Sequence, residues 1–393
     1  MLALISFLPL AAVVYGSPLT NYTGPPNAHC ARTTYRISLP PYTTIPFNSS
    51  LATDLDPTQP AVTELQAQFT SSQADFTEDY MSGTNSSTGA VYDISGVLCT
   101  PKGGDKHNGT IQLLVHGIAF DSSYWDLAFQ PENYSYVWRA AAEGYTTFRY
   151  DRLGTGESDH PFDGYHEVQA ATDLQILLQI ISLLHSGGIG GNAYSSIFAI
   201  GHSYGSIQLA AASGIVPGQL SALVLTGFSA NGSYVGQFQT SNAFSRADET
   251  QPSRFTGLPG SYVISGLPQS SQINFFYYPF YDLDIASFSF STTQPVTQGV
   301  LFTFTSLING ASNFTGPVHV VTGDRDWVFC GAQCDIEPDG QHTILELVGP
   351  TIFPQSSNFS VFSPANTGHG LNMHLSTPDS YTNIMDWLNA LSA

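Results

Sequence analysis

From residue 111 onward the sequence alternates short apolar runs with segments of helical character, and this alternation limits the possible folds more than any other feature. Uninterrupted apolar runs that end at Gly, Asp or Ser indicate strands buried on both faces, which occur in parallel sheets covered by helices. We therefore expect an α/β fold with a mostly parallel central sheet flanked by helices. The expected strands are IQLLVHG, TTFRYD, SIFAIGHS, ALVLTG and VHVVTGD.

The segments between and around these strands complete the pattern. Helical periodicity predicts helices over 134–144, 166–187, 203–216 and, at the end of the chain, 380–392. This last helix is expected to start with Ser376 or Thr377 as its cap and Pro378 in its first turn. Two earlier runs, TTYRISL and VYDISGVLC, resemble strands that pair antiparallel at an edge of the sheet, with a helix between them.

One catalytic domain that carries an insertion fits the chain better than two equal domains, because no linker divides the sequence into halves. We expect a signal peptide over 1–17, an N-terminal arm packed on the catalytic domain over 18–88, and the first part of the core over 89–229. Residues 230–312 interrupt the alternation with irregular, aromatic sequence. They are too long for a structureless loop, so they are expected to form a lid or cap, followed by the rest of the core over 313–393.

Several features predict that the protein is secreted. The apolar run LALISFLPLAAVV is too short to span a bilayer and is followed by small residues, which is typical of a signal peptide. Eight sequons for N-glycosylation along the chain also favour a eukaryotic secretory route. The sequon asparagines are Asn21, Asn48, Asn85, Asn108, Asn133, Asn231, Asn313 and Asn358.

The four cysteines allow three pairings. Cys330 and Cys334 are close enough in sequence for a local loop disulfide, which leaves Cys30 to pair with Cys99 and tie the arm to an early strand. Metal binding by these cysteines is weakly supported, since no second Cys or His stands at the expected spacing around Cys30 or Cys99. We expect neither a metal nor a cofactor.

The charge balance also excludes classes of partner. The formal net charge is −20, which repels nucleic-acid backbones and anionic membranes. Apart from the N-terminal run, no apolar stretch approaches the length of a membrane span. The expected partner is a small-molecule substrate.

The strongest chemical signal is Gly201-His202-Ser203-Tyr204-Gly205, a G-x-S-x-G pattern between an apolar strand and a helical segment. A serine at a sharp strand-to-helix turn is exposed in a strained backbone conformation, and small flanking residues let the chain pass closely. Ser203 is therefore the predicted nucleophile. His202, at the neighbouring position, is predicted to be structural.

A serine hydroxyl needs a base, and the base needs an orienting carboxylate. His369 lies in a Gly-flanked loop before the last helix and is the predicted base, with His374 as the alternative or as a surface or capping histidine. Asp326 is the preferred acid, because it lies two residues farther from the strand end than Asp324, the other candidate.

The negative charge that develops on a reacting carbonyl needs two backbone donors. One is the N–H of Tyr204, directly after the nucleophile. The other is expected from the turn after the first core strand, at Ile118 or its neighbour Ala119, with His116 as a brace of this turn.

Together these motifs resemble the α/β-hydrolase superfamily, and most closely its fungal secreted members. The resemblance covers about residues 90–390 and keeps the order Ser, Asp, His along the chain. The motifs that carry it are HG at 116–117, YWD at 124–126, DRLGTGES at 151–158, GHSYG at 201–205, GDRD at 323–326 and GHG at 368–370.

The resemblance implies that Ser203, Asp326 and His369 form a catalytic triad. In this family the turn that begins at Asp151 and Arg152 is structural, so neither is proposed as catalytic. The superfamily does not account for the N-terminal arm.

These residues predict a serine hydrolase that cleaves a carboxylic ester or a related acyl bond through an acyl-enzyme. Peptidase, thioesterase and lyase activities on the same scaffold remain open, as does a catalytically silent binding protein. The aromatic run in the insertion suggests a hydrophobic or aromatic substrate, although the rings fit a role as lid core equally well. The candidate substrate-binding residues are Phe276, Tyr277, Tyr278 and Phe280.

Overall fold

The computed structural model describes residues 24–47, 50–71, 81, 83–87, 89–308 and 310–392. The expected signal peptide and the sequons at Asn21 and Asn48 lie outside the described residues. In the described part of the chain, no helix is both long and apolar enough to cross a bilayer.

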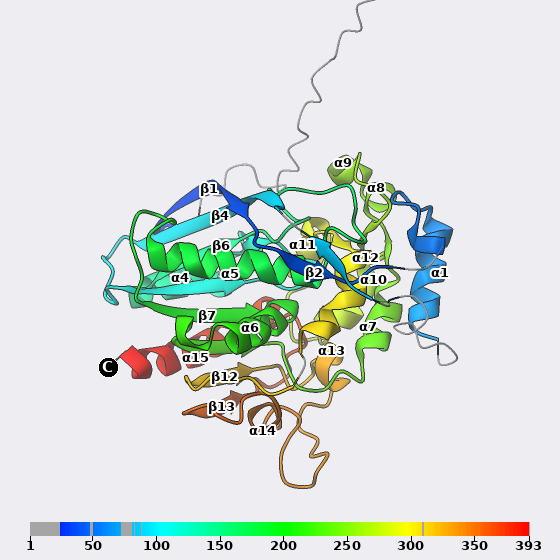
Figure 1. The fold of residues 1–393 in the computed structure, drawn as a ribbon. Helices are drawn as coiled ribbons and strands as arrows, with labels where there is room; N and C mark the ends of the chain where they lie inside the picture. The colour runs from blue at the N-terminus through cyan, green and yellow to red at the C-terminus, as the bar shows by residue number, and fades with distance from the viewer. Residues whose placement is uncertain are drawn as a thin grey trace, which may run out of the picture.

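An eight-stranded sheet forms the centre of the molecule (Figure 1), which confirms the predicted α/β fold. All neighbouring strands are parallel except at β4, which is antiparallel to both of its neighbours. In sheet order the strands are β1 (Ala28–Ser38), β4 (Val91–Pro101), β6 (Thr146–Tyr150), β5 (Thr110–Val115), β7 (Ser196–His202), β8 (Ala222–Thr226), β12 (Val318–Val321) and β13 (Phe359–Phe362).

The strand order reverses at β5, whose two neighbours are the next two core strands along the chain, β6 and β7. Loops that leave the carboxyl ends of parallel strands diverge at such a reversal, and the crevice between them is where ligands bind in open α/β sheets. The loops after β5 and β7 therefore mark the expected position of a site.

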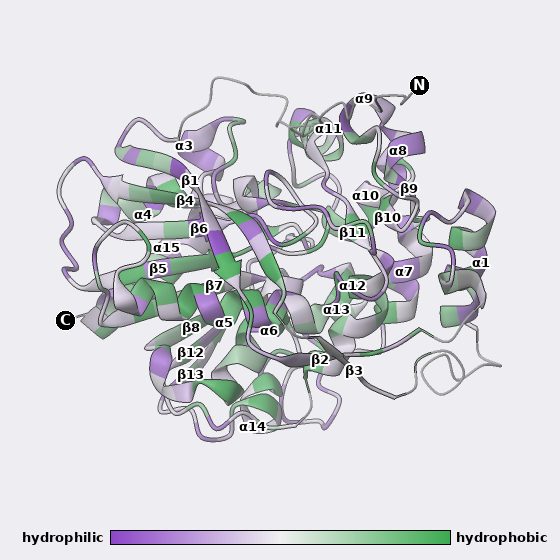
Figure 2. Cartoon of the chain, turned by 45° about the horizontal axis from the view of Figure 1, so that its top comes forward, coloured by the Kyte–Doolittle hydropathy of each residue, from purple (hydrophilic) through white to green (hydrophobic). Residues whose placement is uncertain are grey.

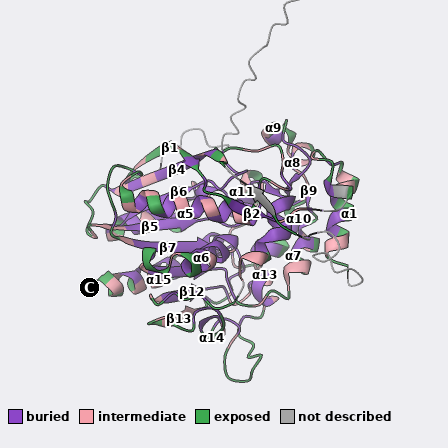
Figure 3. Ribbon diagram, in the orientation of Figure 1, coloured by how far each residue is buried: buried purple, intermediate pink, exposed green. Residues whose placement is uncertain are grey.

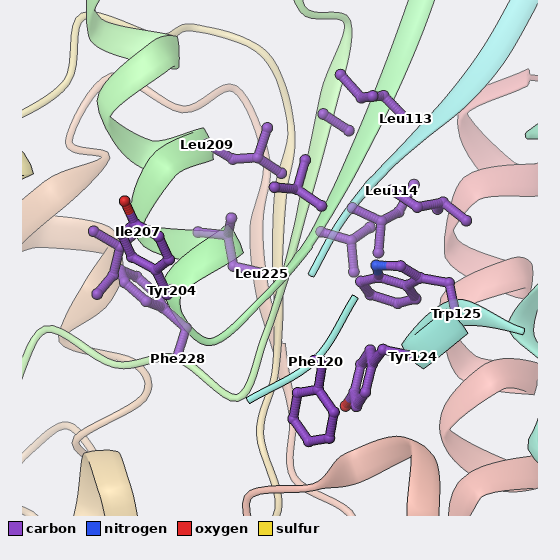
Figure 4. Packing of buried hydrophobic residues seen from close by; sticks show 14 of the residues in the cluster. Leu113, Leu114, Phe120, Tyr124, Trp125, Tyr204, Ile207, Leu209, Leu225 and Phe228 are labelled. Atoms are coloured by element: carbon purple, nitrogen blue, oxygen red, sulfur yellow. The ribbon is translucent and has the colours of Figure 1, made fainter. Parts of the chain in front are cut away.

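Helices cover both faces of this sheet. In Figure 4 the strands pass between α6 on one side and the C-terminal helix on the other. The central strands are hydrophobic in Figure 2 and buried in Figure 3, as their continuous apolar sequences predict. The main helices outside the insertion are α4 (Tyr136–Glu143), α5 (Ala170–Ser186), α6 (Tyr204–Ile215) and α15 (Thr377–Ser392).

The start of helix α5 differs from the sequence prediction. It begins four residues later than expected, because the Asp163 carboxylate accepts hydrogen bonds from the Tyr165 and His166 N–H groups (3.0 and 2.9 Å) and holds them in a turn. Helix α15 begins at Thr377 with Pro378 in its first turn, where a missing N–H costs nothing, in agreement with the predicted start at Ser376 or Thr377.

The chain between β8 and β12 forms a cap beyond one end of the sheet (Figure 1). Its short strands pair as a second sheet in the order β11, β10, β9. In chain order the cap contains α7 (Val235–Asn242), β9 (Ser245–Arg246), α8 (Ala247–Thr250), α9 (Pro252–Phe255), β10 (Tyr262–Ile264), α10 (Pro268–Phe275), α11 (Leu283–Thr292), β11 (Val296–Thr297), α12 (Gln298–Thr303) and the 3₁₀ turn η4 (Phe304–Leu307).

The N-terminal arm contacts both parts of the molecule. Strand β1 extends the main sheet, and Cys30 pairs with Cys99 opposite it on β4 through a disulfide. Helix α1 (Gln59–Phe69) packs on α7 of the cap, where the Gln59 side chain accepts a hydrogen bond from Arg246 N (2.7 Å). The arm therefore fastens the cap to the sheet.

Shorter elements complete the described chain. Strands β2 and β3 pair antiparallel as a separate two-stranded sheet. Their bounds and those of the remaining elements are β2 (Tyr42–Thr44), η1 (Ser50–Ala52), β3 (Asn85–Ser87), η2 (Ser122–Trp125), α3 (Pro131–Tyr134), η3 (Pro217–Gln219), α13 (Trp327–Cys330), α14 (Val348–Ile352) and η5 (Leu371–Met373).

Candidate active site

Ser203 lies at the sharp turn between β7 and α6. Its backbone φ of 54° is in the left-handed region, which is strained for a residue with a Cβ. The Ser203 N–H donates to the Thr226 carbonyl of the neighbouring strand (2.9 Å), so the strained turn is tied to the sheet. A strained residue held by its surroundings points to function.

The two glycines of the G-x-S-x-G pattern are required by close packing around this turn. A Cβ on Gly201 would lie 2.6 Å from the Ser206 nitrogen, and a Cβ on Gly205 would overlap the Val115 carbonyl oxygen at the end of β5. The turn after β5 is equally crowded, since a Cβ on Gly117 would lie 2.9 Å from the Ser203 Cβ. Glycine at these positions lets the loops after β5 and β7 touch.

Ser203, His369 and Asp326 form a continuous chain of hydrogen bonds. The His369 Nε2 lies 2.8 Å from the Ser203 Oγ, and its Nδ1 lies 2.7 Å from the Asp326 Oδ2. A carboxylate only accepts hydrogen bonds, so Nδ1 carries the proton and Nε2 is free to accept the one from serine. The imidazole and the carboxylate are buried, whereas Ser203 is half-buried and faces a cavity.

Asp326 is held in place by a second interaction. It caps the N-terminus of α13, where its Oδ1 accepts a hydrogen bond from Phe329 N (2.9 Å). The disulfide between Cys330 and Cys334 closes the loop that follows, and the Cys334 N–H donates to the Asp324 carbonyl (3.2 Å). The position of the acid is thus fixed on both sides.

Asp324, the other candidate acid, braces the loop of the histidine. Its Oδ1 accepts a hydrogen bond from Thr367 N (3.0 Å), two residues before His369, and its Oδ2 lies 3.5 Å from Arg325. It does not contact the imidazole.

His374 is neither the base nor a surface histidine, so the prediction of a surface position is wrong, whereas the predicted capping role agrees with its place as the C-cap residue of the 3₁₀ turn η5. It is buried, and its Nε2 accepts hydrogen bonds from the Gly368 and Tyr277 N–H groups (3.0 and 3.1 Å). Its Nδ1 donates to the Gly370 carbonyl (2.9 Å). Burial lowers the pKa of His374 to about 4, so the ring stays neutral and keeps all three bonds at neutral pH. His374 thereby joins the His369 loop to the cap.

The predicted oxyanion donors lie on either side of Ser203. As the first residue of α6, Tyr204 has no partner for its N–H within the helix. Ile118 lines the same cavity as Ser203. The Ala119 carbonyl accepts a hydrogen bond from Gln294 N (2.9 Å), which ties the turn after β5 to the cap.

A buried ion pair braces the two segments that carry these donors. Arg152 contacts Asp173 (2.7 Å), donates to the Gly117 carbonyl (3.2 Å) and lies 4.7 Å from the centre of the Tyr204 ring. The Arg152 N–H donates to the His116 Nε2 (3.0 Å), which places His116 in the expected role of a turn brace. The turn that begins at Asp151 is structural here, as the resemblance implies.

Aromatic rings surround the imidazole of His369. The rings of Phe275 and Phe329 lie 5.9 and 5.7 Å from it, and that of His202 lies 4.9 Å away. Burial, and then the proximity of His369, lower the pKa of His202 well below its usual value. His202 therefore stays neutral and stacks on Tyr124 (4.3 Å), in agreement with the structural role predicted for it.

A cavity of about 210 Å³ opens beside Ser203. It is walled by side chains from α6, α7, η4 and the segment after Asp326, and most of them are apolar. The residues that form most of these walls carry no signal in the sequence, because they come from distant segments and look like ordinary core residues. Those that define its walls are Ile207, Val235, Phe238, Phe304, Val328 and Ile352.

The four aromatic residues expected to bind substrate do not line this cavity. Phe276 is buried against Tyr281 and His374, Tyr277 stacks on Phe280 (5.8 Å), and Tyr278 is exposed. The segment packs on the His369 loop instead. The interpretation that the rings form part of the cap structure agrees with this placement.

Five sequon side chains are described. Asn108, Asn133, Asn313 and Asn358 are exposed, whereas Asn231 is half-buried and lines the cavity beside Ser203. Within the described ranges, no group of three His, Cys, Asp or Glu side chains is arranged to hold a metal.

The chain is similar to several solved structures of low sequence identity. A monoacylglycerol lipase of Paleococcus ferrophilus is 15% identical over 72% of this chain and 95% of that chain, with a TM-score of 0.48. A thermophilic esterase from Thermogutta terrifontis is 17% identical over 77% and 95%, with a TM-score of 0.47. VrEH2 is 14% identical over 76% and 96%, with a TM-score of 0.50.

Sequence comparison gives the family. No curated protein matches the chain. The sequence profile of the alpha/beta hydrolase family matches residues 112–384, which is more than half of the chain and includes all three members of the hydrogen-bonded chain. The match is to the family as a whole, and the fungal subgroup remains a prediction. With this match and the observed sheet, the chain belongs to the alpha/beta hydrolase family.

Proposed function

We propose that the protein is a secreted serine hydrolase that cleaves carboxylic esters through an acyl-enzyme on Ser203. The observation that carries this proposal is the chain of hydrogen bonds from Ser203 through His369 to Asp326, with distances of 2.8 and 2.7 Å, at the wall of an apolar cavity.

In the first half of the reaction, His369 Nε2 takes the Ser203 proton while the Oγ attacks the carbonyl carbon of the ester. The negative oxygen accepts hydrogen bonds from the N–H groups of Tyr204 and Ile118. When the tetrahedral intermediate collapses, the bond to the alcohol oxygen breaks and the alcohol leaves with the proton from His369.

In the second half, His369 takes a proton from water, which attacks the acyl carbon. The bond to the Ser203 Oγ then breaks, and the histidine returns its proton to the serine as the acid is released. The carboxylate of Asp326 stabilises the imidazolium that forms in both halves. His202 stays uncharged, so no second positive charge opposes protonation of His369.

The cavity supports an ester with an apolar acyl group. Among the described residues that line it, none has an acidic or basic side chain, so they offer no partner for a charged substrate group. Burial of apolar substrate surface supplies the binding free energy in such a site.

Secretion is part of the proposal. The apolar leader, the sequons and the two disulfides support export to an oxidising compartment. Mass spectrometry of the protein from the culture medium of a eukaryotic host tests it, with a mature N-terminus near residue 18 as the expected result.

A fluorophosphonate probe and p-nitrophenyl acetate test the hydrolase assignment. We expect the wild type to be labelled and active, and Ser203→Ala to be neither. Ser380→Ala is the matched control, because this buried serine lies on α15 away from the cavity and is expected to keep both properties. A folded wild type that resists the probe and hydrolyses no ester would contradict the proposal and favour a binding protein.

A further inference from the structure

A second cavity of about 340 Å³ lies next to the one beside Ser203. Ile308 and Ile352 line both cavities, so their side chains form the wall between them. Ile352 is buried at the end of α14, and Ile308 is half-buried directly after η4.

The two cavities follow one face of α6. Tyr204 and Ile207 line the first, and Ala210, Ala211 and Gly214 line the second. Residues at these spacings share a helix face, and the ten steps from Tyr204 to Gly214 span about 15 Å at 1.5 Å per residue. In Figure 4 Tyr204 and Ile207 lie on the same side of α6. The second cavity therefore continues the first, away from the nucleophile.

The lining of the second cavity fits an alkyl chain. None of the described side chains that line it is charged, and its α6 wall consists of alanine and glycine apart from Ile215 at the end of the helix. Its two serine hydroxyls already have partners, since Ser306 donates to the Thr303 carbonyl (2.6 Å) and Ser312 bonds Ser213 (2.9 Å). Small residues along one helix face form a groove that matches the width of a hydrocarbon chain.

We propose that Ile308 and Ile352 set the upper length of the acyl chain, and that the second cavity receives the tail of a longer fatty acyl group once this wall is cut back. The inference rests on the proposed function, because the carbonyl carbon of the same chain must reach Ser203. It identifies aliphatic fatty acyl esters as the substrate class of the cavity beside the nucleophile.

The test compares p-nitrophenyl esters from acetyl to palmitoyl on the wild type and on Ile352→Ala. We expect wild-type kcat/KM to fall once the acyl chain exceeds the first cavity. The variant is expected to gain about fourfold in kcat/KM for each methylene that enters the second cavity. The gain is read as the ratio of the long-chain to the acetyl kcat/KM, because this ratio cancels any effect of the substitution that all esters share.

Two further variants link the gain to the second cavity. Gly214 has room for a side chain, because an added Cβ would meet only the Ser312 Oγ at 3.8 Å. Adding Gly214→Leu to Ile352→Ala should therefore abolish the gain on long chains. Ile384→Ala removes the same atoms from α15, outside both cavities, and is expected to leave the ratio of long-chain to acetyl rates unchanged. If Ile352→Ala fails to fold, Ile308→Ala replaces it at the half-buried position.

An active Ile352→Ala variant with the wild-type chain-length profile would overturn the inference and leave the hydrolase assignment intact. If no ester is hydrolysed at all, the hydrolase assignment fails by itself. Binding of dodecanamide to Ser203→Ala, with and without Ile352→Ala, then tests the cavities by calorimetry. Tighter binding to the double variant supports the inference, and equal binding overturns it.

Discussion

Replacement of His374 by asparagine or by glutamine separates its two roles as hydrogen-bond acceptor and donor. Asparagine places its amide near the Nδ1 position and keeps a donor for the Gly370 carbonyl, but it removes the acceptor of the Gly368 and Tyr277 N–H groups. Glutamine reaches the Nε2 position and keeps an acceptor for these N–H groups, but it removes the donor. The two variants therefore break opposite halves of one junction.

The hydrogen bonds of His374 predict which of the two substitutions lowers the free energy of unfolding more. A buried N–H without an acceptor costs about 1–3 kcal/mol, and asparagine leaves two of them. Tyr277 is only half-buried and reaches water in part, so we expect His374→Asn to lower the free energy of unfolding by about 2–4 kcal/mol. His374→Gln loses one ordinary hydrogen bond, with an expected cost of about 1 kcal/mol.

The effect on catalysis should follow the same order. Gly368 precedes His369, and a displacement of about 1 Å at a catalytic group costs about 100-fold in rate. We expect kcat of His374→Asn to fall about 100-fold and that of His374→Gln to fall about 10-fold or less. KM should change little in both, because His374 does not line the cavity.

The assay is steady-state hydrolysis of p-nitrophenyl acetate, together with urea unfolding of both variants. A loss of stability without a loss of kcat would assign His374 a purely structural role. Equal effects of the two substitutions, or a rise in KM at constant kcat, would refute the reasoning from its hydrogen bonds.

Two other predictions follow from the buried ionisable groups. The substitution Asp326→Asn presents an amide donor to His369, which forces the imidazole proton onto Nε2 and removes the acceptor for the serine proton. We expect kcat to fall about 10⁴-fold with little change in KM. A fall in kcat of less than 10-fold would contradict the role of Asp326. In the folded state, burial lowers the pKa of His374 to about 4 and also that of His202, so the unfolded chain binds protons first as the pH falls below about 6.5. The contribution of these histidines to the free energy of unfolding is therefore fully present above that pH and is lost toward pH 4, by about 3 kcal/mol for His374 alone. The free energy of unfolding of His374→Gln, measured in urea, should depend less on pH than that of the wild type. An unchanged pH dependence would argue against this contribution.

The fold was predictable because its determinants are local in the sequence. The five core strands are continuous apolar runs with turn residues at their ends, and they occupy the centre of the sheet as expected. The start of α5, which differs from the prediction, depends on a side chain in a turn. Asp163 delays the start of α5 by hydrogen bonds to two N–H groups, and hydrophobic periodicity carries no signal for such a turn.

The hydrogen-bonded residues Ser203, His369 and Asp326 could be predicted from the sequence for a related reason. Each of the three residues follows a core strand at the carboxyl edge of the sheet, where side chains from distant segments meet. Glycines that the packing requires, such as Gly201 and Gly205, add a signal that can be read from the sequence alone. The spacing from the strand end favoured Asp326 over Asp324, and the structure places Asp326 against the imidazole.

The residues that form the walls of the cavity could not be predicted from the sequence in this way. Val235, Phe238, Phe304 and Ile352 come from three elements that are far apart in the chain, and each looks like an ordinary core residue in its own segment. The contacts of His374 were not predicted, because its partners are backbone groups, one of them nearly a hundred residues away in the cap. Backbone partners leave no residue-type pattern to detect.

The aromatic segment of the cap shows how composition can suggest the right region and the wrong contact. Aromatic side chains bury large areas whatever they touch, so the sequence could not distinguish a substrate contact from a packing contact. In the structure Phe275 lies beside the imidazole of His369, and its carbonyl accepts a hydrogen bond from Gly370 N (2.7 Å). His374 adds a bond from the same loop to Tyr277 N. This part of the cap is therefore joined to the His369 loop, and its displacement would move the imidazole that Ser203 needs.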